Sequence, residues 1–340
     1  MMNRETGLLE TYSLIRDLSS TGSRVDSELL DRMMYSAETL PPLGKEYWWF
    51  LFFGQNNGTP VQFMQLIFRK YGKKMLFNNE EMTFRRPRKD GLKAVTAGWI
   101  YDGNGLQDLG DTNAFVEILE NEVITTISER KMTFAGKYPQ YKLKIEDIVD
   151  LDITQGEHLI TREAYGVFLP PFGMGWVNIF LDARGTLLGN PFEGTAHLQK
   201  VVGATIFGPF HWGRVVFKNG SSVTLFCLKT GKNSKTYLRK SLTFCDSESG
   251  TIMKLTNPNL EIVKEGDTWV INGRDGEKEL EIVLKIYATK QYSMKGGGSQ
   301  QYIEYVVAPQ EFRFRLKAEN RVITLCDLGG GVGTFEDAFW

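Results

Sequence analysis

Apolar positions in the first forty residues follow a helical period. In residues 6–20 they recur at mixed three- and four-residue spacing, which predicts a short helix. Residues 24–40 repeat such a pattern, with Asp26 or Ser27 as the candidate N-cap, and the pattern stops before Pro41. Because both predicted helices precede the first predicted strand, our hypothesis is that they plug or cover the mouth of a barrel.

After residue 42 the pattern changes to short β-rich runs with turn signals between them. The segment 214–228 is a clear hairpin, because two apolar arms flank the turn residues Asn219 and Gly220. Regular short strands with hardly any helical period predict an all-β fold of antiparallel barrels or sandwiches. The predicted strands are 47–53, 61–69, 93–101, 122–128, 131–135, 141–147, 174–181, 211–218, 223–229, 241–245, 268–272, 279–288, 302–307, 311–317 and 321–326.

The length of the chain predicts two such units. A chain of 340 residues exceeds the usual size of one hydrophobic core. The region 170–202 is rich in Gly and Pro, which is typical of the passage from one unit to the next. We therefore expect a helical segment over 1–42, a first β domain over 43–200 and a second over 201–340.

One predicted strand lacks the alternation of a half-exposed strand. In 46–53, "EYWWFLFF", every residue after Glu46 is apolar. Such a strand is buried on both faces. We expect one face inside its barrel and the other under a helix, the second unit or a ligand.

Charge and the scarcity of ligating residues limit the function. The chain has 40 basic and 41 acidic residues, so nothing indicates a nucleic-acid partner. No window approaches the ~20 apolar residues of a membrane span, and we expect a cytoplasmic protein. The three cysteines and three histidines are scattered, without the spacing of a disulfide framework or a metal site. We predict no metal and no cofactor.

Carboxylates beside aromatic residues are the candidate chemistry. Glu46, Glu193 and Glu336 each adjoin aromatic residues, and aromatic residues make up 12% of the chain. A carboxyl group in an apolar site has a raised pKa and can act as a general acid, while aromatic faces stabilise a carbocation. The alternative for each carboxylate is a structural role, capping a strand or pairing with an arginine.

Three parts of the chain resemble the two-domain lipocalin-like superfamily, which includes carotenoid 1,2-hydratase, tocopherol cyclase-like proteins and Diels-Alderase-type cyclases. Residues 46–53 and 61–70 are similar to its E-W-W-Y-F and F-Q-x-x-F-F strands. Residues 201–217, "VVGATIFGPFHWGRVVF", stand where the family has D-H-x-W-G, and 329–340, "GGGVGTFEDAFW", are similar to its closing strand.

The resemblance implies two calycin-type barrels or sandwiches packed together. It also implies an apolar isoprenoid or polyketide-like ligand in the first barrel or between the two. The implied activity is hydration, cyclisation or a pericyclic rearrangement of that ligand; the alternatives are a carrier with the same cavity and a scaffold whose barrels are filled by side chains. The candidate residues are Glu46, Glu336 and His211 as catalytic groups, and Trp48, Phe50, Trp176, Phe210 and Trp212 as pocket walls.

The family motif and this chain differ by one position. Trp212 and Gly213 match its W-G, but its Asp-His positions fall on Pro209 and Phe210, so His211 occupies the variable place between. A shift of one residue in a strand moves a side chain to the other face. We therefore expect His211 on the opposite face from Trp212, and the favoured role for it is a histidine satisfied by the sheet.

Overall fold

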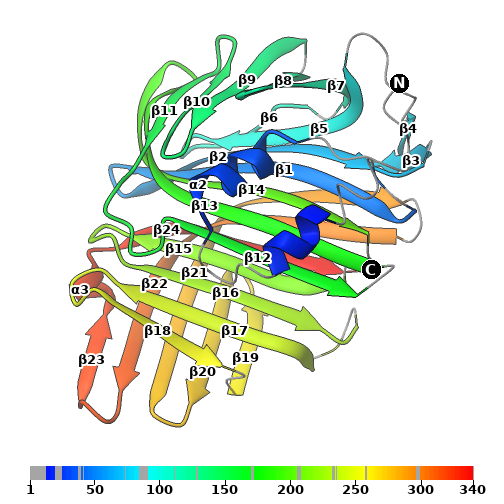
Figure 1. Ribbon diagram of the computed structural model, residues 1–340. Coiled ribbons are helices and arrows are strands. Elements are labelled where there is room, and N and C mark those ends of the chain that lie inside the picture. The colour runs from blue at the N-terminus through cyan, green and yellow to red at the C-terminus, as the bar shows by residue number, and fades with distance from the viewer. Residues whose placement is uncertain are drawn as a thin grey trace.

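The protein is an antiparallel β structure of two large sheets with few helices, as the sequence predicts (Figure 1). It is known from a computed structural model, in which the first sheet and the second lie one above the other in Figure 1. The residues that the structure describes are 13–19, 25–36, 40, 42–72, 74–83, 91–110, 112–127, 129–169, 172–204, 208–231, 234, 236–256, 259–295 and 299–339.

The first sheet closes into a barrel of ten antiparallel strands. The closure is the pairing of β11 with β13, which joins the two ends of the ring. Two further strands lie outside the ring: β6 (Leu106–Asp108) pairs with β5, and β12 (Arg162–Leu169) pairs with β13. In ring order the ten strands are β11 (Val149–Thr154), β10 (Gln140–Ile145), β9 (Arg130–Lys137), β8 (Glu122–Ile127), β7 (Thr112–Leu119), β5 (Leu92–Tyr101), β2 (Thr59–Lys70), β1 (Gly44–Asn56), β14 (Asn190–Ala204) and β13 (Phe172–Leu187).

The second sheet curls around a core of its own without closing. Within the described residues no pairing joins its two end strands, β18 and β19. A short strand, β23 (Arg321–Thr324), pairs with β22 and leads into the helical turn α3 (Leu325–Leu328). In sheet order the strands are β18 (Thr251–Thr256), β17 (Tyr237–Asp246), β16 (Ser222–Lys229), β15 (Phe210–Phe217), β24 (Gly331–Phe339), β22 (Ser299–Leu316), β21 (Lys278–Lys295), β20 (Thr268–Asp275) and β19 (Asn259–Glu265).

The helix α2 (Ser27–Met34) lies across the barrel (Figure 1). Asp26 is its N-cap, since the Asp26 carboxylate accepts a hydrogen bond from the backbone N–H of Leu29 at 2.7 Å. At the other end Trp48 of β1 donates to the Met34 carbonyl, and Tyr35 donates to a carbonyl of β9. Because β1 and β9 are five strands apart either way around the ring of ten, the C-terminal end of the helix contacts opposite walls of the barrel. This geometry supports the hypothesis of a plug.

A second helical turn, residues 13–19, packs on β12 and β13. Close approach is possible because these strands carry glycines where the helix contacts them. A Cβ added at Gly175 would come within 2.6 Å of the Leu18 side chain, and one at Gly166 within 2.7 Å of the Ile15 carbonyl. No helix in the described part of the chain is long and apolar enough to cross a bilayer.

The strand β1 is buried on both faces, as its sequence predicts. Trp48, Phe50 and Phe52 point into the barrel core, whereas the side chains between them belong to a second cluster. We call this second cluster the central layer. It lies between the outer face of β1, β2 and β5 and the facing side of β15, β22 and β24. Its members include Trp49, Leu51, Phe53, Met64, Val95, Trp99, Tyr101, Trp212, Val216, Tyr302, Val306 and Val332.

Strands do not respect the expected boundary between the two halves of the chain. The strand β14 runs through the expected boundary at residue 200 and pairs with β1 as far as Ala204, opposite Gly44. The hairpin of β3 (Lys74–Phe77) and β4 (Glu80–Thr83) comes from the first half, yet it joins the second sheet where Phe77 pairs with Met294. The division into 1–42, 43–200 and 201–340 stays a prediction.

Candidate functional site

Two carboxyl groups lie side by side in the central layer. Glu304 of β22 and Glu336 of β24 are directly opposite each other in the sheet, and Trp212 of β15 is opposite Glu336 on the other side. Directly opposite residues place their Cβ atoms about 5 Å apart. Glu304 is 2% exposed and Glu336 4% exposed, so water reaches neither carboxyl group freely.

The barrel supplies hydrogen-bond donors to this pair. The indole N–H of Trp99, on β5, donates to Glu304 Oε2 at 2.6 Å. The indole N–H of Trp49, on β1, makes no hydrogen bond among the described residues, but its side chain also lowers the pKa of Glu304. The Tyr302 side chain lowers the pKa of Glu336, and Glu336 Oε1 has no hydrogen-bond partner among the described residues. The two carboxyl groups therefore have unequal surroundings.

The different surroundings of Glu304 and Glu336 determine which of the two carboxyl groups keeps a proton near neutral pH. Burial raises the pKa of Glu304 to about 7, and the hydrogen bond from Trp99 and the nearby Trp49 side chain oppose that rise. Burial raises the pKa of Glu336 well above its ordinary value, and the adjacent negative charge of Glu304 raises it further. Two carboxyl groups at this distance titrate as a pair. Near neutral pH the pair holds at least one proton, and Glu336 is its favoured carrier.

Aromatic rings surround the pair. Trp49 and Trp212 meet edge to face with their centroids 5.2 Å apart, and the His197 ring lies 5.4 Å from Trp212. Burial holds the pKa of His197 well below its ordinary value, with a further lowering from Arg214, so this imidazole is neutral. The guanidinium of Arg214 lies 3.9 Å from the ring centroid of Phe180. A cation formed here would face π electrons rather than bulk water.

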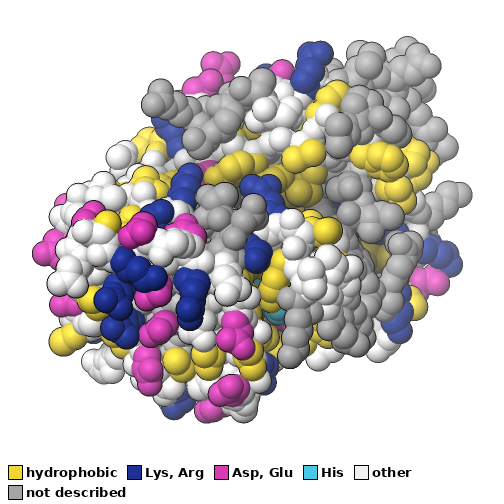
Figure 2. All heavy atoms as spheres, turned by 90° about the horizontal axis from the view of Figure 1, so that it is seen from below, with side chains coloured by type: hydrophobic (Ala, Val, Ile, Leu, Met, Phe, Trp, Pro, Cys, Tyr) yellow, Lys and Arg dark blue, Asp and Glu magenta, His cyan; other side chains and the backbone are white. Residues whose placement is uncertain are grey.

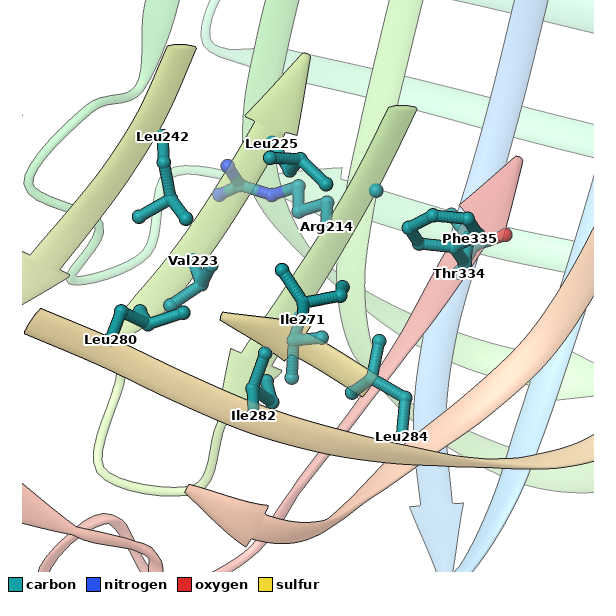
Figure 3. A pocket seen from close by; sticks show the side chains of 12 residues that line it. Arg214, Val223, Leu225, Leu242, Ile271, Leu280, Ile282, Leu284, Thr334 and Phe335 are labelled. Atoms are coloured by element: carbon teal, nitrogen blue, oxygen red, sulfur yellow. The ribbon is translucent and has the colours of Figure 1, made fainter. Parts of the chain in front are cut away.

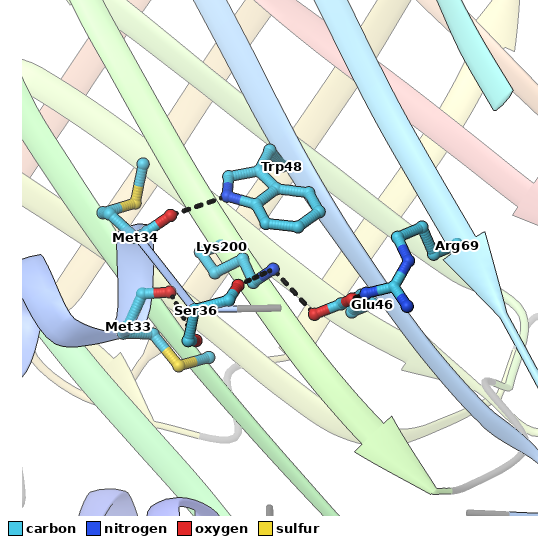
Figure 4. A network of polar contacts seen from close by, with 7 residues as sticks. All are labelled: Met33, Met34, Ser36, Glu46, Trp48, Arg69 and Lys200. Atoms are coloured by element: carbon cyan, nitrogen blue, oxygen red, sulfur yellow. Dashed lines mark hydrogen bonds and ion pairs between the residues drawn. The ribbon is translucent and has the colours of Figure 1, made fainter. Parts of the chain in front are cut away.

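Glu46 lies on the other face of β1, inside the barrel (Figure 4). Its carboxylate is held between the Arg69 guanidinium and Lys200 Nζ, the latter 2.8 Å from Glu46 Oε2. Lys200 also donates to the Ser36 carbonyl, just after α2. Two cations stabilise an ionised carboxylate. The geometry is that of a structural ion pair, and the role of Glu46 as an acid stays a prediction without support from its contacts.

Three of the predicted wall residues lie away from the carboxyl pair. Trp48 lies inside the barrel, where Lys200 Nζ packs over its ring at 2.8 Å from the ring centroid. Phe50 packs on Phe134 in the barrel core, with centroids 4.9 Å apart. Trp176 stacks on Tyr165 on the β12–β13 side of the barrel, at 5.3 Å. None of these contacts reaches Glu304 or Glu336.

The residues 210–212 divide between the two faces of β15. Trp212 lies in the central layer, and Phe210 packs near Tyr302, with centroids 6.3 Å apart. His211 points into the core of the second sheet, where its Nδ1 lies 3.3 Å from Asp337 Oδ1. Burial lowers the pKa of His211 to about 4 against the opposing effect of Asp337, so the ring is neutral. Of the predicted residues, the structure brings together Glu336, Trp212 and Phe210.

Sequence reasoning missed Glu304 and the residues that contact it. The signal was present in 302–307, "YIEYVV", where a lone Glu interrupts an otherwise apolar run. A carboxylate on a strand buried on both faces needs a partner or a function. Its pairing with Glu336 depends on sheet order, because β22 and β24 are not consecutive in the chain.

One internal cavity and one surface cleft lie outside the central layer. One lies inside the second sheet and has about 10 Å³, room for one water molecule, between apolar side chains such as Leu242, Ile271 and Ile282 (Figure 3). The other is a surface cleft of about 460 Å³ at the ends of β1, β13 and β14, lined partly by Gln55 and Glu193. Of the two, only the cleft has the size of an organic ligand site. On the face shown in Figure 2, acidic and basic side chains are interspersed.

Comparison with known proteins supports the fold. No protein-family model matches the sequence, and no curated protein matches it in sequence. The crystal structure of CghA aligns with a TM-score of 0.52 at 12% identity, over 94% of each chain. Kievitone hydratase from Nectria haematococca aligns with a TM-score of 0.42 at 10% identity, over 94% of this chain and 96% of that chain. The likeness to CghA shows a shared architecture that spans both sheets.

Proposed function

We propose that the protein is an enzyme that acts on a large, mostly apolar, alkene-bearing molecule in the central layer. The observation that carries the proposal is the buried Glu304–Glu336 pair, which faces the rings of Trp49, Trp99 and Trp212. Buried carboxyl groups with raised pKa values and a specific partner are characteristic of functional sites. A purely structural interface would gain more from apolar side chains at these two positions.

The Glu304–Glu336 pair can catalyse acid-initiated hydration or cyclisation of an alkene. Glu336 transfers its proton to one alkene carbon, so a C–H bond forms and the π bond breaks to leave a carbocation on the other carbon. The rings of Trp49 and Trp212 stabilise that cation. In hydration a water molecule forms the new C–O bond and releases a proton to the pair; in cyclisation a second alkene forms a C–C bond and the new cation loses its proton to Glu336.

A pericyclic rearrangement would use the same layer differently. It needs the walls to hold one reactive conformer and needs no proton transfer. The rate would then be nearly independent of the ionisation of Glu304 and Glu336, whereas acid-initiated chemistry falls as the pair loses its proton.

The cleft of about 460 Å³ is the proposed approach to the layer. Gln55 borders the cleft and donates a hydrogen bond from Nε2 to the Gly331 carbonyl of β24 at 2.6 Å. This contact links the barrel to the second sheet at the rim of the central layer. Entry of a substrate would separate the barrel from the second sheet at the contact between Gln55 and Gly331.

The test begins with the ligand that purifies with the protein. Solvent extraction and native mass spectrometry identify it, and the extracted compound is then incubated with wild type and with Glu336→Gln, Glu304→Gln and Glu281→Gln. Glu281 is a control, because its side chain is 58% exposed on the second sheet. We expect a loss of about 100-fold or more in turnover for Glu336→Gln and unchanged turnover for Glu281→Gln. Wild type that retains the compound but never converts it would indicate a carrier instead.

A further inference from the structure

The amide of Gln62 is buried and makes no hydrogen bond within the part of the chain that the structure describes. Its side chain is completely buried on the face of β2 that points into the central layer. Its cross-strand neighbours are Phe53 and Tyr101. Neither the oxygen nor the nitrogen of the Gln62 amide has a hydrogen-bond partner among the described residues.

The same strand holds a second buried glutamine whose amide is partly satisfied. Gln65, three residues further on, points to the opposite face, and its Nε2 donates to the carbonyls of Ala97 at 2.9 Å and Leu66 at 3.1 Å, while its Oε1 has no partner among the described residues. Buried polar groups are nearly always paired, and each exception needs an explanation. Packing does not explain Gln62, because an apolar side chain of similar size would fill its place without the loss of hydrogen bonds to water.

Gln62 stands between the surface cleft and the carboxyl pair. On one side its neighbour on the same face is Met64, which is opposite Trp99, the donor to Glu304. Same-face neighbours on a strand are about 7 Å apart. On the other side the next row holds Gln55, which borders the cleft. By register, Gln62 therefore stands one row from Gln55 at the cleft and one row from the pair of Met64 with Trp99, the donor to Glu304.

We propose that Gln62 binds an oxygen atom of the substrate, a ketone or hydroxyl group on an otherwise apolar skeleton. Its N–H donates to a carbonyl or hydroxyl oxygen, and its own oxygen accepts from a hydroxyl. Gln62 thereby selects oxygen-bearing molecules over pure hydrocarbons, which leave the amide unpaired. The inference rests on the proposed function, which places the substrate in the central layer.

The experiment compares two probes in two matched variants. The probes are farnesylacetone, a methyl ketone with three alkenes, and the hydrocarbon of the same carbon skeleton without the oxygen. Binding is followed by quenching of tryptophan fluorescence, since three indoles line the layer. We expect wild type to bind the ketone about tenfold more tightly than the hydrocarbon. Gln62→Met should abolish that preference by weakening ketone binding, whereas Gln65→Met should keep it.

Thermal unfolding of the unliganded variants supplies the second readout. We expect Gln62→Met to unfold at the wild-type temperature or higher, because it removes an unpaired amide, and Gln65→Met to unfold lower. Equal affinity of wild type for both probes, a preference unchanged in Gln62→Met, or a melting temperature for Gln62→Met as low as that of Gln65→Met would each overturn the inference. An unchanged preference is also the result expected if ordered water satisfies the amide.

The two proposals fail in different ways. A preference that disappears in Gln62→Met, together with turnover that survives Glu336→Gln, supports the role of Gln62 and refutes the acid chemistry. Turnover that is lost in Glu336→Gln, together with an unchanged preference in Gln62→Met, does the reverse.

Discussion

Titration of the carboxyl pair should make the stability of this protein fall as pH rises through neutrality. Burial raises the pKa of Glu304 from 4.5 to about 7, so between these values the folded state keeps a proton that the unfolded chain releases. The free energy of unfolding therefore falls with rising pH in this window. At about 1.4 kcal/mol per pKa unit, the loss that Glu304 causes is about 3 kcal/mol between pH 5 and pH 8.

The perturbation is Glu304→Gln, which keeps an acceptor for the Trp99 indole N–H but cannot ionise. Urea unfolding at pH 5, 6, 7 and 8 gives the free energy of unfolding at each pH. We expect wild type to lose about 3 kcal/mol more than Glu304→Gln over this range, and the exposed control Glu281→Gln to follow wild type. Parallel curves for wild type and Glu304→Gln would refute the reasoning.

Three further predictions concern the barrel. Lys200→Met leaves the buried Glu46 carboxylate without one of its two cations and should lower the free energy of unfolding by about 3 kcal/mol; a loss below about 1 kcal/mol in urea unfolding would contradict it. Removing residues 1–40 deletes the four buried apolar side chains of α2, together worth about 6–12 kcal/mol, so the truncated chain should fail to fold; a cooperative melting transition at the wild-type temperature would show otherwise. Gly194→Ala places a Cβ 2.3 Å from the Phe53 carbonyl and should lower the melting temperature by several degrees, whereas an unchanged melting curve would mean that β1 and β14 separate freely.

The periodicity of single strands predicted much of the fold. The uninterrupted apolar run 46–53 indicated burial on both faces, and β1 is buried in the barrel core on one face and in the central layer on the other. The two-residue period of 210–217 separated His211 from Trp212, and the structure places them on opposite faces of β15. Local sequence contains this information because side chains alternate along a strand.

Sheet order, by contrast, is a long-range property. Glu304 meets Glu336 only because β22 pairs with β24, and no local pattern indicates that pairing. Glu46 has its cations because β1 lies between β2 and β14, which bring Arg69 and Lys200 to it. The sequence therefore identified Glu336 as an acid candidate but could not identify its partner.

The central claim is that Glu336 carries a proton near neutral pH in the layer between the two sheets. Infrared difference spectroscopy measures this directly, because a protonated carboxyl group has a carbonyl stretch that a carboxylate lacks. We predict that the spectrum of wild type at pH 7 contains a protonated-carboxyl band that is clearly weaker in Glu336→Gln, where only the partly protonated Glu304 contributes, and unchanged in Glu281→Gln. A wild-type spectrum without that band, or a band of equal intensity in Glu336→Gln, would contradict the account.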